Sequence, residues 1–251
     1  TVQLRGRFAA SLIPSLPFKF FPNSIFIVVL QKKIRHVLIC LYDVLLLPLK
    51  AAAQLRLQNK TGIIGVHQPI KGEIALKLYV TRHGQTQWNA ENRVCGATNL
   101  PLNEAGEQQA RQLAEKAADY QLDVVICSPM RRAVATAQTV AQRCGVPCLI
   151  DPRLYEQNFG LYEGVQRDDP SYQQAKQNLA SRFPQGESIF QLVHRIYGFL
   201  EEIAVRYRGK RVLLVCHGVA SRVIHSYFVD MTNQQFADCL LGNCEIREYE
   251  L

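Results

Sequence analysis

The chain has 251 residues, of which 48% are hydrophobic and 20% are charged. These values are typical of a globular protein, and they exclude a disordered chain, a collagen-like repeat and a small disulfide-stabilised protein. The formal net charge of +8 is uneven, because residues 1–75 hold ten Lys and Arg against two acidic residues. Residues 76–251 carry 19 basic and 19 acidic side chains, so the charge gives no reason to expect a nucleic-acid partner for them.

Residues 1–75 are expected to be an N-terminal extension and not a folded domain, because prolines interrupt them and no amphipathic period emerges. Their apolar stretches, 25–30 and 37–47, are shorter than the ~20 residues that span a bilayer. A membrane partner is therefore expected only if this extension acts as a surface anchor. A second hypothesis is that translation starts at Leu76 and that the start of the given sequence is mis-assigned. The codons for residues 71–73 can form a ribosome-binding site, and the codon for Leu76 can be the start codon TTG.

The eight cysteines form no Cys-x-x-Cys pair and lack the spacing of a zinc site. Cys127 and Cys216 lie in apolar runs, which is typical of buried free thiols. We therefore expect a reducing compartment, the cytoplasm.

From residue 76 onward, short apolar runs alternate with amphipathic segments. Strands are predicted at 76–81, 123–127 and 146–150, and a helix is predicted at 104–120. Ser128 and Pro129 predict the start of a second helix, as an N-cap and a first-turn proline. That helix is expected to run to about Cys144 and to end at Gly145.

The second half of the chain continues the alternation. Apolar residues three and four apart predict a helix over 188–207. An apolar strand is predicted at 211–216, followed by a helix over 218–228 and an edge strand over 243–249. This pattern predicts a three-layer α/β/α sandwich with a mostly parallel central sheet, formed by residues 76–251.

Phosphate-binding residue types follow three of the predicted strands. Arg82 and His83 follow the first, Arg131 and Arg132 follow the second apolar strand, and His217 follows the strand at 211–216. The carboxyl ends of parallel strands share one edge of a sheet, where ligands bind. Arginine presents planar donors to phosphate oxygens, and histidine can form covalent intermediates. We therefore expect these side chains to converge in one crevice.

Six sequence blocks in a fixed order make this pattern more specific. They are Arg-His-Gly-Gln-Thr-x-Trp-Asn at 82–89, and then segments at 96–110, 128–137, 154–164, 184–188 and 215–218. Together they resemble the histidine phosphatase superfamily, whose best-known branch is cofactor-dependent phosphoglycerate mutase. The resemblance covers residues 76–251 and none of 1–75. It implies a phosphoglycerate mutase-like fold and an enzyme that acts on a small phosphorylated metabolite through a phosphohistidine.

The resemblance also implies a role for six residues. His83 matches the histidine that takes the phosphoryl group, and Glu156 matches the acid that protonates the leaving oxygen. The groups expected to hold the phosphate are Arg82, Asn89, Arg132 and His217. Phosphoryl transfer depends mainly on positioning and on stabilisation of charge, which two guanidiniums and an imidazole can supply. No metal and no cofactor is implied.

Two of these assignments have neighbouring competitors. The family pattern places the pocket arginine directly before an alanine, which favours Arg132 over Arg131. Glu163 competes with Glu156 for the acid role, but it precedes Gly164 in a predicted turn, and we expect it to be structural.

Two asparagines depart from the family pattern. Asn99 stands where an aspartate is usual, which removes a negative charge near the pocket mouth, and Asn103 replaces a threonine. Asparagine is a good helix N-cap, so we expect Asn103 to begin the helix that follows it.

The segment between Glu156 and Pro184 distinguishes the branches of the family. It has 27 residues here and few basic ones, whereas mutases usually carry a longer and more basic insertion. A short cover favours a phosphatase, with phosphoglycerate mutase as the alternative. A non-catalytic phospho-ligand-binding module would be expected to lack His83 or Glu156, and both are present. The sequence is compatible with a homodimer.

Overall fold

The computed structural model describes residues 75–251. The chain divides into two units, Thr1–Gly65 and Val66–Leu251, and all the described residues belong to the second. The predictions for the N-terminal extension, including a surface anchor and a mis-assigned start, fall outside the described residues and stay predictions.

A five-stranded sheet in the order β3-β2-β4-β1-β5 forms the middle layer. Its strands are parallel except β5, which pairs antiparallel with β1 at one edge. The strands are β1 Lys77–Arg82, β2 Val124–Cys127, β3 Cys148–Ile150, β4 Arg211–Cys216 and β5 Ile246–Glu250. All five predicted strands are confirmed, with ends that shift by up to three residues.

The pairing register brings three strand ends to one level. Arg82 of β1 pairs with Cys216 of β4, and Cys127 of β2 pairs with Val215 of β4. The residues that follow these strands therefore leave the sheet side by side.

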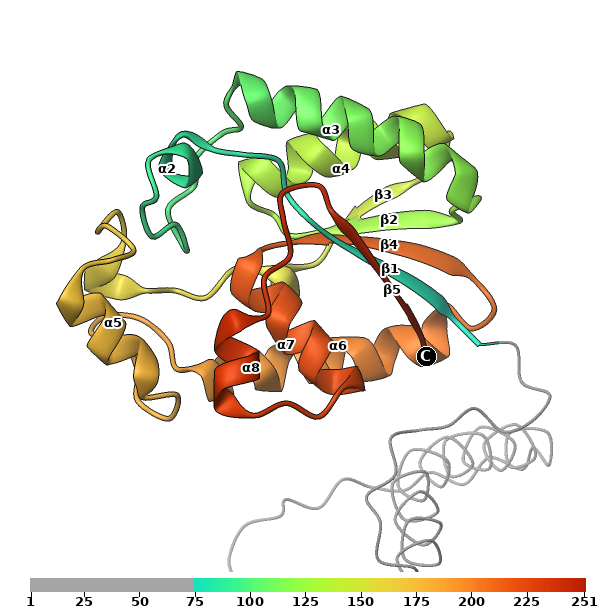
Figure 1. Cartoon of the computed structure of the whole chain (residues 1–251). Coiled ribbons are helices and arrows are strands. Elements are labelled where there is room, and N and C mark those ends of the chain that lie inside the picture. Colours follow the sequence, from blue (N-terminus) through green and yellow to red (C-terminus); the bar gives the residue numbers. More distant parts are fainter. Residues whose placement is uncertain (1–74) are drawn as a thin grey trace, which may run out of the picture. The chain divides into compact units, whose positions relative to one another are not determined.

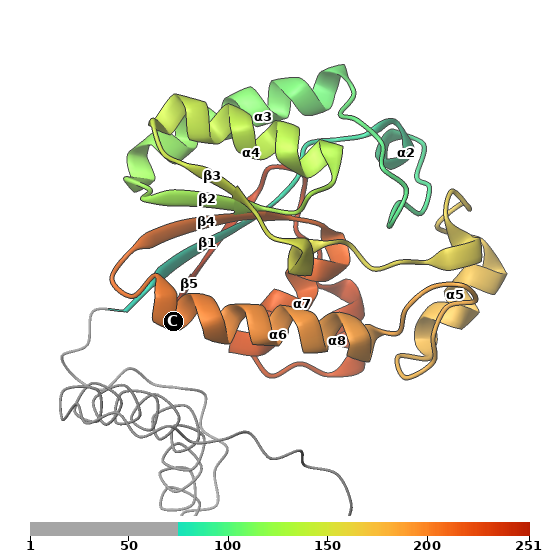
Figure 2. The same cartoon turned by 180° about the vertical axis from the view of Figure 1, so that it is seen from behind.

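Helices cover both faces of the sheet, as the sandwich prediction requires. In Figures 1 and 2, α3 and α4 lie on one face, and α6 and α7 lie on the other with α8 beside them. The helices are α2 Gln87–Ala90, α3 Glu104–Ala117, α4 Arg131–Cys144, α5 Pro170–Gln177, α6 Ile189–Arg206, α7 Gly218–Phe228 and α8 Asn233–Asp238. Within residues 75–251, three short 3-10 helices span Ala118–Tyr120, Pro152–Leu154 and Gly160–Tyr162.

Strand β4 shows why the sheet needs helices on both sides. Val212 and Leu214 pack in the core beneath α6 and α7, whereas Leu213 and Val215 pack in the core beneath α3 and α4. All four are fully buried. A strand with apolar residues on both faces loses water contact only between two layers of helices, which fixes the three-layer arrangement.

The predicted start of the second helix is wrong by two residues. Helix α4 begins at Arg131, and its N-cap, Met130, provides no side-chain hydrogen bond. Ser128 is not the cap, because its hydroxyl lies 2.8 Å from Nε2 of His217 at the end of a neighbouring strand. The predicted end is confirmed, since Gly145 caps the helix in the left-handed conformation at φ 68°.

The segment that links β3 to α6 extends beyond the carboxyl edge of the sheet. It contains α5, which lies at the same end of this unit as α2 (Figure 1). A small aromatic cluster holds the segment together, with ring centroids 5.3 to 6.1 Å apart, formed by Phe159, Tyr162, Tyr172 and Phe183. The segment therefore has its own core, separate from the two cores of the sheet.

The seven cysteines in the described part of the chain are free thiols. No helix among the described residues combines the length and the apolar character needed to cross a membrane. The cytoplasmic location stays a prediction.

Candidate active site

His83 lies directly after β1 and is 3% exposed. Its Nδ1 is 2.7 Å from the carbonyl oxygen of Gly84. A carbonyl can only accept a hydrogen bond, so Nδ1 must carry the ring proton. Thr136 fixes this turn, because its hydroxyl accepts a hydrogen bond from the Gly84 N–H at 3.0 Å. The other ring nitrogen, Nε2, is left with a lone pair.

Arg132 approaches that lone pair from the first turn of α4. Its Nε donates to Nε2 of His83 over 3.2 Å, and its Nη groups donate to the carbonyl oxygens of Thr98 and Gly96 at 2.8 and 2.7 Å. A guanidinium has donors only, so this contact requires the same tautomer of His83. The Arg132 side chain is fully buried, whereas the adjacent Arg131 is exposed. Of the two candidates, the structure therefore brings Arg132 to His83.

Arg82 and His217 complete the group of cations and imidazoles at this edge. The rings of His83 and His217 lie 5.0 Å apart between centroids. Within residues 75–251, two buried side-chain nitrogens have no hydrogen-bond partner, Nε of Arg82 and Nδ1 of His217. Buried polar atoms in folded proteins are almost always paired, and exceptions call for an explanation. Both exceptions belong to the predicted phosphate-binding set.

The site keeps its imidazoles neutral and the Arg82 guanidinium charged. Burial, and then the positive charges of Arg132 and Arg82, hold the pKa of His83 well below its usual range. Burial is also the main reason why the pKa of His217 is low, followed by the charge of Arg132. Burial and the nearby Arg167 lower the pKa of Arg82 to about 10, so this group stays protonated at neutral pH. The pocket is therefore positively charged and holds a neutral nucleophile candidate.

The Glu156 side chain reaches the N-terminus of α7, where its carboxylate accepts backbone hydrogen bonds. Its Oε1 accepts from the N–H groups of Gln157 and Ala220 at 2.9 and 3.1 Å, and its Oε2 accepts from the N–H of Val219 at 3.0 Å. A Cβ on Gly218 would meet Oε2 at 3.6 Å and the guanidinium carbon of Arg82 at 3.9 Å. Glu156 and Arg82 thus lie on the same side of Gly218, beside the imidazoles.

Glu163 does not enter this group and instead holds a loop. Its carboxylate accepts hydrogen bonds from the N–H groups of residues 96, 97, 98 and 159, and from the Thr98 hydroxyl at 2.8 Å. The loop residues Gly96 and Thr98 are the ones whose carbonyls bind Arg132. Glu163 therefore positions Arg132 through this loop, and its structural role is confirmed.

Gly96 shows how tightly the loop is packed. A Cβ at this position would come within 2.1 Å of the Gln157 carbonyl oxygen, next to Glu156, and within 2.4 Å of Oε1 of Glu163. Only glycine lets the loop approach the backbone of the Glu156 segment so closely.

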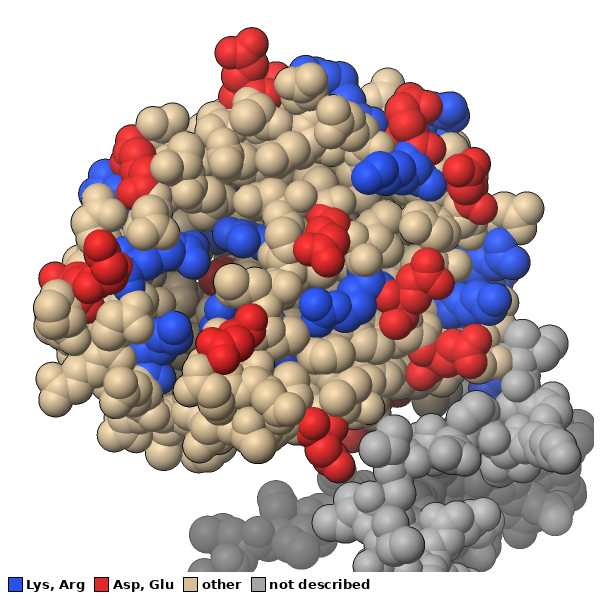
Figure 3. All heavy atoms as spheres, viewed as in Figure 1, with Lys and Arg blue, Asp and Glu red and all other residues tan. Residues whose placement is uncertain are grey.

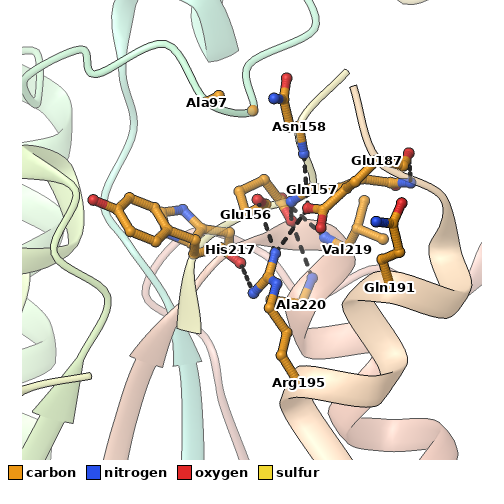
Figure 4. Close-up of polar contacts among 12 residues, drawn as sticks. Ala97, Glu156, Gln157, Asn158, Glu187, Gln191, Arg195, His217, Val219 and Ala220 are labelled. Atoms are coloured by element: carbon orange, nitrogen blue, oxygen red, sulfur yellow. Dashed lines mark hydrogen bonds and ion pairs between the residues drawn. The ribbon is translucent and has the colours of Figure 1, made fainter. Parts of the chain in front are cut away.

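Arg195 orients the backbone that carries Glu156. It reaches from α6 to the carbonyl oxygens of Arg153, Tyr155 and Glu156, at 2.6, 2.7 and 3.2 Å. Its guanidinium also pairs with Glu187 at 2.8 Å, and the same Glu187 oxygen accepts from the N–H of Asn158 at 2.9 Å. Figure 4 shows Arg195 and Glu187 meeting beside the Glu156 segment.

Within residues 75–251, no hydrogen bond or ring contact joins Asn89 to the other predicted site residues. It lies on α2, where its Oδ1 accepts from the N–H of Thr86 at 3.2 Å and its own N–H donates to the Thr86 hydroxyl at 3.3 Å. This capping box uses the carbonyl end of the Asn89 amide and leaves its Nδ2 group as the donor end. Its contact with a phosphate stays a prediction.

Both asparagines that depart from the family pattern cap helices. Asn103 accepts from the Gly106 N–H at 2.8 Å and begins α3, as predicted. Asn99 accepts from the Arg131 N–H at 2.8 Å, so it supplies the cap that α4 lacks from its own N-cap residue.

Four residues that support the site were not predicted as such. Arg195, Thr136 and Ser128 hold Glu156, Gly84 and His217, and Arg167 adds charge beside Arg82. Ser128 and Thr136 lie inside a block of the family pattern, which was a signal available in the sequence. Arg195 had no such signal, because its contacts come from residues about 40 positions earlier in the chain.

The fold and the site define an α/β protein with buried guanidiniums and imidazoles gathered at the carboxyl edge of a mostly parallel sheet. The model of the histidine phosphatase superfamily (branch 1) matches residues 78–251. The chain belongs to this superfamily, and its fold is phosphoglycerate mutase-like.

Individual relatives carry different activity names. The probable phosphoglycerate mutase GpmB of Escherichia fergusonii is 37% identical over 178 residues, which cover 68% of this chain and 83% of that protein. The mycobacterial glucosyl-3-phosphoglycerate phosphatase is 27% identical with a TM-score of 0.62, over 68% of this chain and 90% of that one. The phosphoserine phosphatase of Entamoeba histolytica, solved with 3-phosphoglyceric acid, is 25% identical with a TM-score of 0.60, over 69% and 89% of the two chains.

Proposed function

We propose that the protein is a phosphomonoester hydrolase that acts on a small phosphorylated metabolite through a phosphohistidine at His83. The observation that carries this proposal is the tautomer of His83. The carbonyl oxygen of Gly84 accepts a hydrogen bond from Nδ1 at 2.7 Å, and within residues 75–251 the hydrogen-bond partner of Nε2 is a donor, Nε of Arg132 at 3.2 Å. A buried imidazole with its lone pair among cations suits attack on an anionic phosphorus centre.

In the first step the Nε–H of Arg132 turns from Nε2 of His83 to a phosphoryl oxygen, which frees the lone pair of Nε2. A bond then forms between Nε2 and phosphorus, and the bond between phosphorus and the ester oxygen breaks. Glu156 donates a proton to the leaving oxygen. Its Oε2 suits this role because it accepts a single hydrogen bond from the described residues, that of the Val219 N–H. In the second step, a water attacks phosphorus, its proton goes to Glu156, and the bond from phosphorus to His83 breaks. The products are an alcohol and inorganic phosphate, and the enzyme is regenerated.

The charge on the transferring group is balanced by protein cations in this proposal. Arg82 and Arg132 donate to the phosphoryl oxygens, with His217 and Asn89 as neutral donors. The unpartnered Nε of Arg82 and Nδ1 of His217 are the atoms that a phosphoryl group would satisfy. Two guanidiniums perform the role that divalent metal ions have in other phosphoryl-transfer enzymes, and we propose that the reaction is metal-independent.

Phosphoglycerate mutase activity is the second candidate, and a specific observation favours it. The relative at 37% identity carries that name, and three cations, Arg167, Lys176 and Arg222, influence one another beside the site. Such cations can retain a bisphosphorylated intermediate. Against this, the segment between Glu156 and Pro184 has only 27 residues. A short cover admits water to the phosphohistidine, and this favours hydrolysis.

Two assays on the same preparation separate these activities. A panel of phosphate monoesters is tested for release of inorganic phosphate, and 3-phosphoglycerate with 2,3-bisphosphoglycerate as primer is followed by phosphorus NMR for formation of 2-phosphoglycerate. We expect phosphate release to exceed isomerisation. Isomerisation without phosphate release would establish the mutase instead, and binding of phosphate esters with neither reaction would favour a non-catalytic module.

A further inference from the structure

A cavity of about 440 Å³ opens beside Glu156. Gln157 and Val219 line it, and both donate a backbone N–H to the Glu156 carboxylate. The cavity therefore begins where the proposed leaving group departs. In Figure 3, Lys and Arg side chains gather around a hollow on this side of the molecule, near α5. Its volume is within the range of pockets that hold drug-sized molecules, and it exceeds what a three-carbon acid needs.

Two cations face this cavity from different helices. Arg222 lies on α7, one turn after Val219, so it stands about 4.5 Å further along the helix axis than the cap of Glu156. Lys176 lies on α5, one turn after the cavity residue Tyr172. Lys176 makes no ion pair or hydrogen bond within the described part of the chain. Arg222 uses only its Nε there, to the Cys239 carbonyl at 2.9 Å.

The charge of the cavity is set by few groups. Asp238 is its single acidic lining residue, and one of its oxygens already accepts from Gln234 at 2.8 Å. Lys176, Arg222 and Asp238 give the lining a formal net charge of +1. Burial lowers the pKa of Lys176, and the charges of Arg222 and Arg167 lower it further. A singly charged anion would neutralise this lining, whereas a second phosphate dianion would exceed it.

The rest of the lining is mixed. Eight apolar or aromatic residues form part of it, and seven uncharged polar residues form the remainder: Gln157, Gln173, Gln177, Asn178, Ser181, Asn233 and Gln234. Phe159, Tyr172 and Phe183 contribute aromatic rings that are locked together by edge and stacked contacts. Leu179, Ile189 and Phe236 add aliphatic and aromatic surface. A ligand body with a flat apolar face would bury that face against the aromatic rings, and a carboxylate on it would reach the two cations.

We propose that the leaving group of the substrate carries a carboxylate on an apolar body, and that Lys176 and Arg222 bind this carboxylate. The inference rests on the proposed function, since it assigns the cavity to the alcohol part of the same phosphomonoester. Arg222 and Lys176 are specificity residues in this account, and they take no part in the transfer itself.

The test compares two aryl esters that differ only in one charge, 3-(4-phosphooxyphenyl)propanoate and its propanamide. Their phenol leaving groups are nearly equal in basicity and size, so a difference in kcat/KM reports recognition of the carboxylate. We expect the parent to prefer the carboxylate roughly tenfold, which is the value of one charge-assisted hydrogen bond. Lys176→Met and Arg222→Met should each remove most of this preference, because kcat/KM should fall much further for the carboxylate ester than for the amide. Lys116→Met, on the exposed face of α3, is the matched control and should keep the preference.

Equal kcat/KM for the two esters in the parent, or a preference that survives both substitutions, would overturn the inference. Binding of the product, 3-(4-hydroxyphenyl)propanoate, against its amide is measured by titration calorimetry on the same proteins. This readout needs no turnover. If neither ester is hydrolysed, the proposed function fails, and the calorimetry still decides whether Lys176 and Arg222 bind a carboxylate.

Discussion

The Nε group of Arg132 donates a hydrogen bond to Nε2 of His83 across 3.2 Å, and both side chains are almost completely shielded from solvent. The contact forces the nitrogen that points into the pocket to be the unprotonated one. It also places a positive charge next to the position where a phosphoryl group would arrive. One hydrogen bond thus prepares both the nucleophile and the charge that balances its reaction.

Replacing Glu156 by Gln should slow the reaction most for poor leaving groups. Gln has a similar size but has no carboxyl proton to give. An alkyl phosphate releases a basic alkoxide and should lose ~10²–10⁴-fold in kcat/KM, whereas p-nitrophenyl phosphate should lose clearly less. Steady-state kinetics on both esters tests this, with a thermal melt to verify folding, because the Gln amide also disturbs the N–H contacts of Val219 and Ala220. Equal losses on the two esters would exclude the acid role.

Replacing Glu163 by Gln should lower the stability of the protein and slow the reaction to a similar extent for good and poor leaving groups. Its carboxylate accepts from several donors of the 96–98 loop, and an amide nitrogen cannot accept. We expect a loss of about 1–3 kcal/mol in the free energy of unfolding. Because Arg132 loses the support of its loop, kcat/KM should fall by similar factors on alkyl and aryl esters. Glu107→Gln, which breaks an exposed helix pair with Arg111, is the control and should change neither quantity appreciably. A loss that depends on the leaving group would contradict a purely positioning role.

The buried imidazoles should make the protein less stable in acid. Burial lowers the pKa of both His83 and His217 in the folded state. As the pH falls below about 6.5, these histidines take up protons in the unfolded chain but stay neutral in the folded protein. Protonation therefore stabilises the unfolded state and lowers the free energy of unfolding. The slope should approach about 1.4 kcal/mol per pH unit for each histidine. Denaturant melts against pH should show a flatter acid limb for His217→Gln than for the parent. A similar flattening in His194→Gln, at an exposed position on α6, would show that burial is not the cause.

The activity should survive chelation of divalent metals. Arg82 and Arg132 supply positive charge at the pocket, and no group of three His, Cys, Asp or Glu side chains within residues 75–251 is arranged to hold a metal ion. The rate of phosphate release after dialysis against EDTA should equal the untreated rate. A loss of activity that magnesium or manganese restores would contradict the metal-independent mechanism.

Much of the fold could be predicted because its elements are locally encoded. The apolar run of β4 and the heptad-like spacing of α6 each indicate their structure without reference to the rest of the chain. Ser188 and Asn103 then begin their helices through hydrogen bonds to residues three positions ahead. Ser128 misled the prediction because a serine hydroxyl suits a helix cap equally well, and only the neighbouring strand brings His217 to it.

The candidate site divides in the same way. His83, Arg82 and His217 could be predicted because they follow strands whose carboxyl ends must meet. Arg195 could not, because an arginine on an amphipathic helix is most simply a solvent-exposed charge, and its partners lie on a separate segment of the chain. The cavity beside α5 could not be predicted either, since it depends on how the aromatic cluster places that helix over α7.

Trapping of the phosphorylated enzyme tests the central claim most directly. The parent and the His83→Ala variant are mixed briefly with a phosphate ester labelled with radioactive phosphorus and quenched in alkali, where phosphohistidine persists. Peptide mapping should place the label on the peptide that contains His83 in the parent, the label should be lost in acid, and the variant should carry none. Label that remains in His83→Ala, or label on another residue of the parent, would contradict the account.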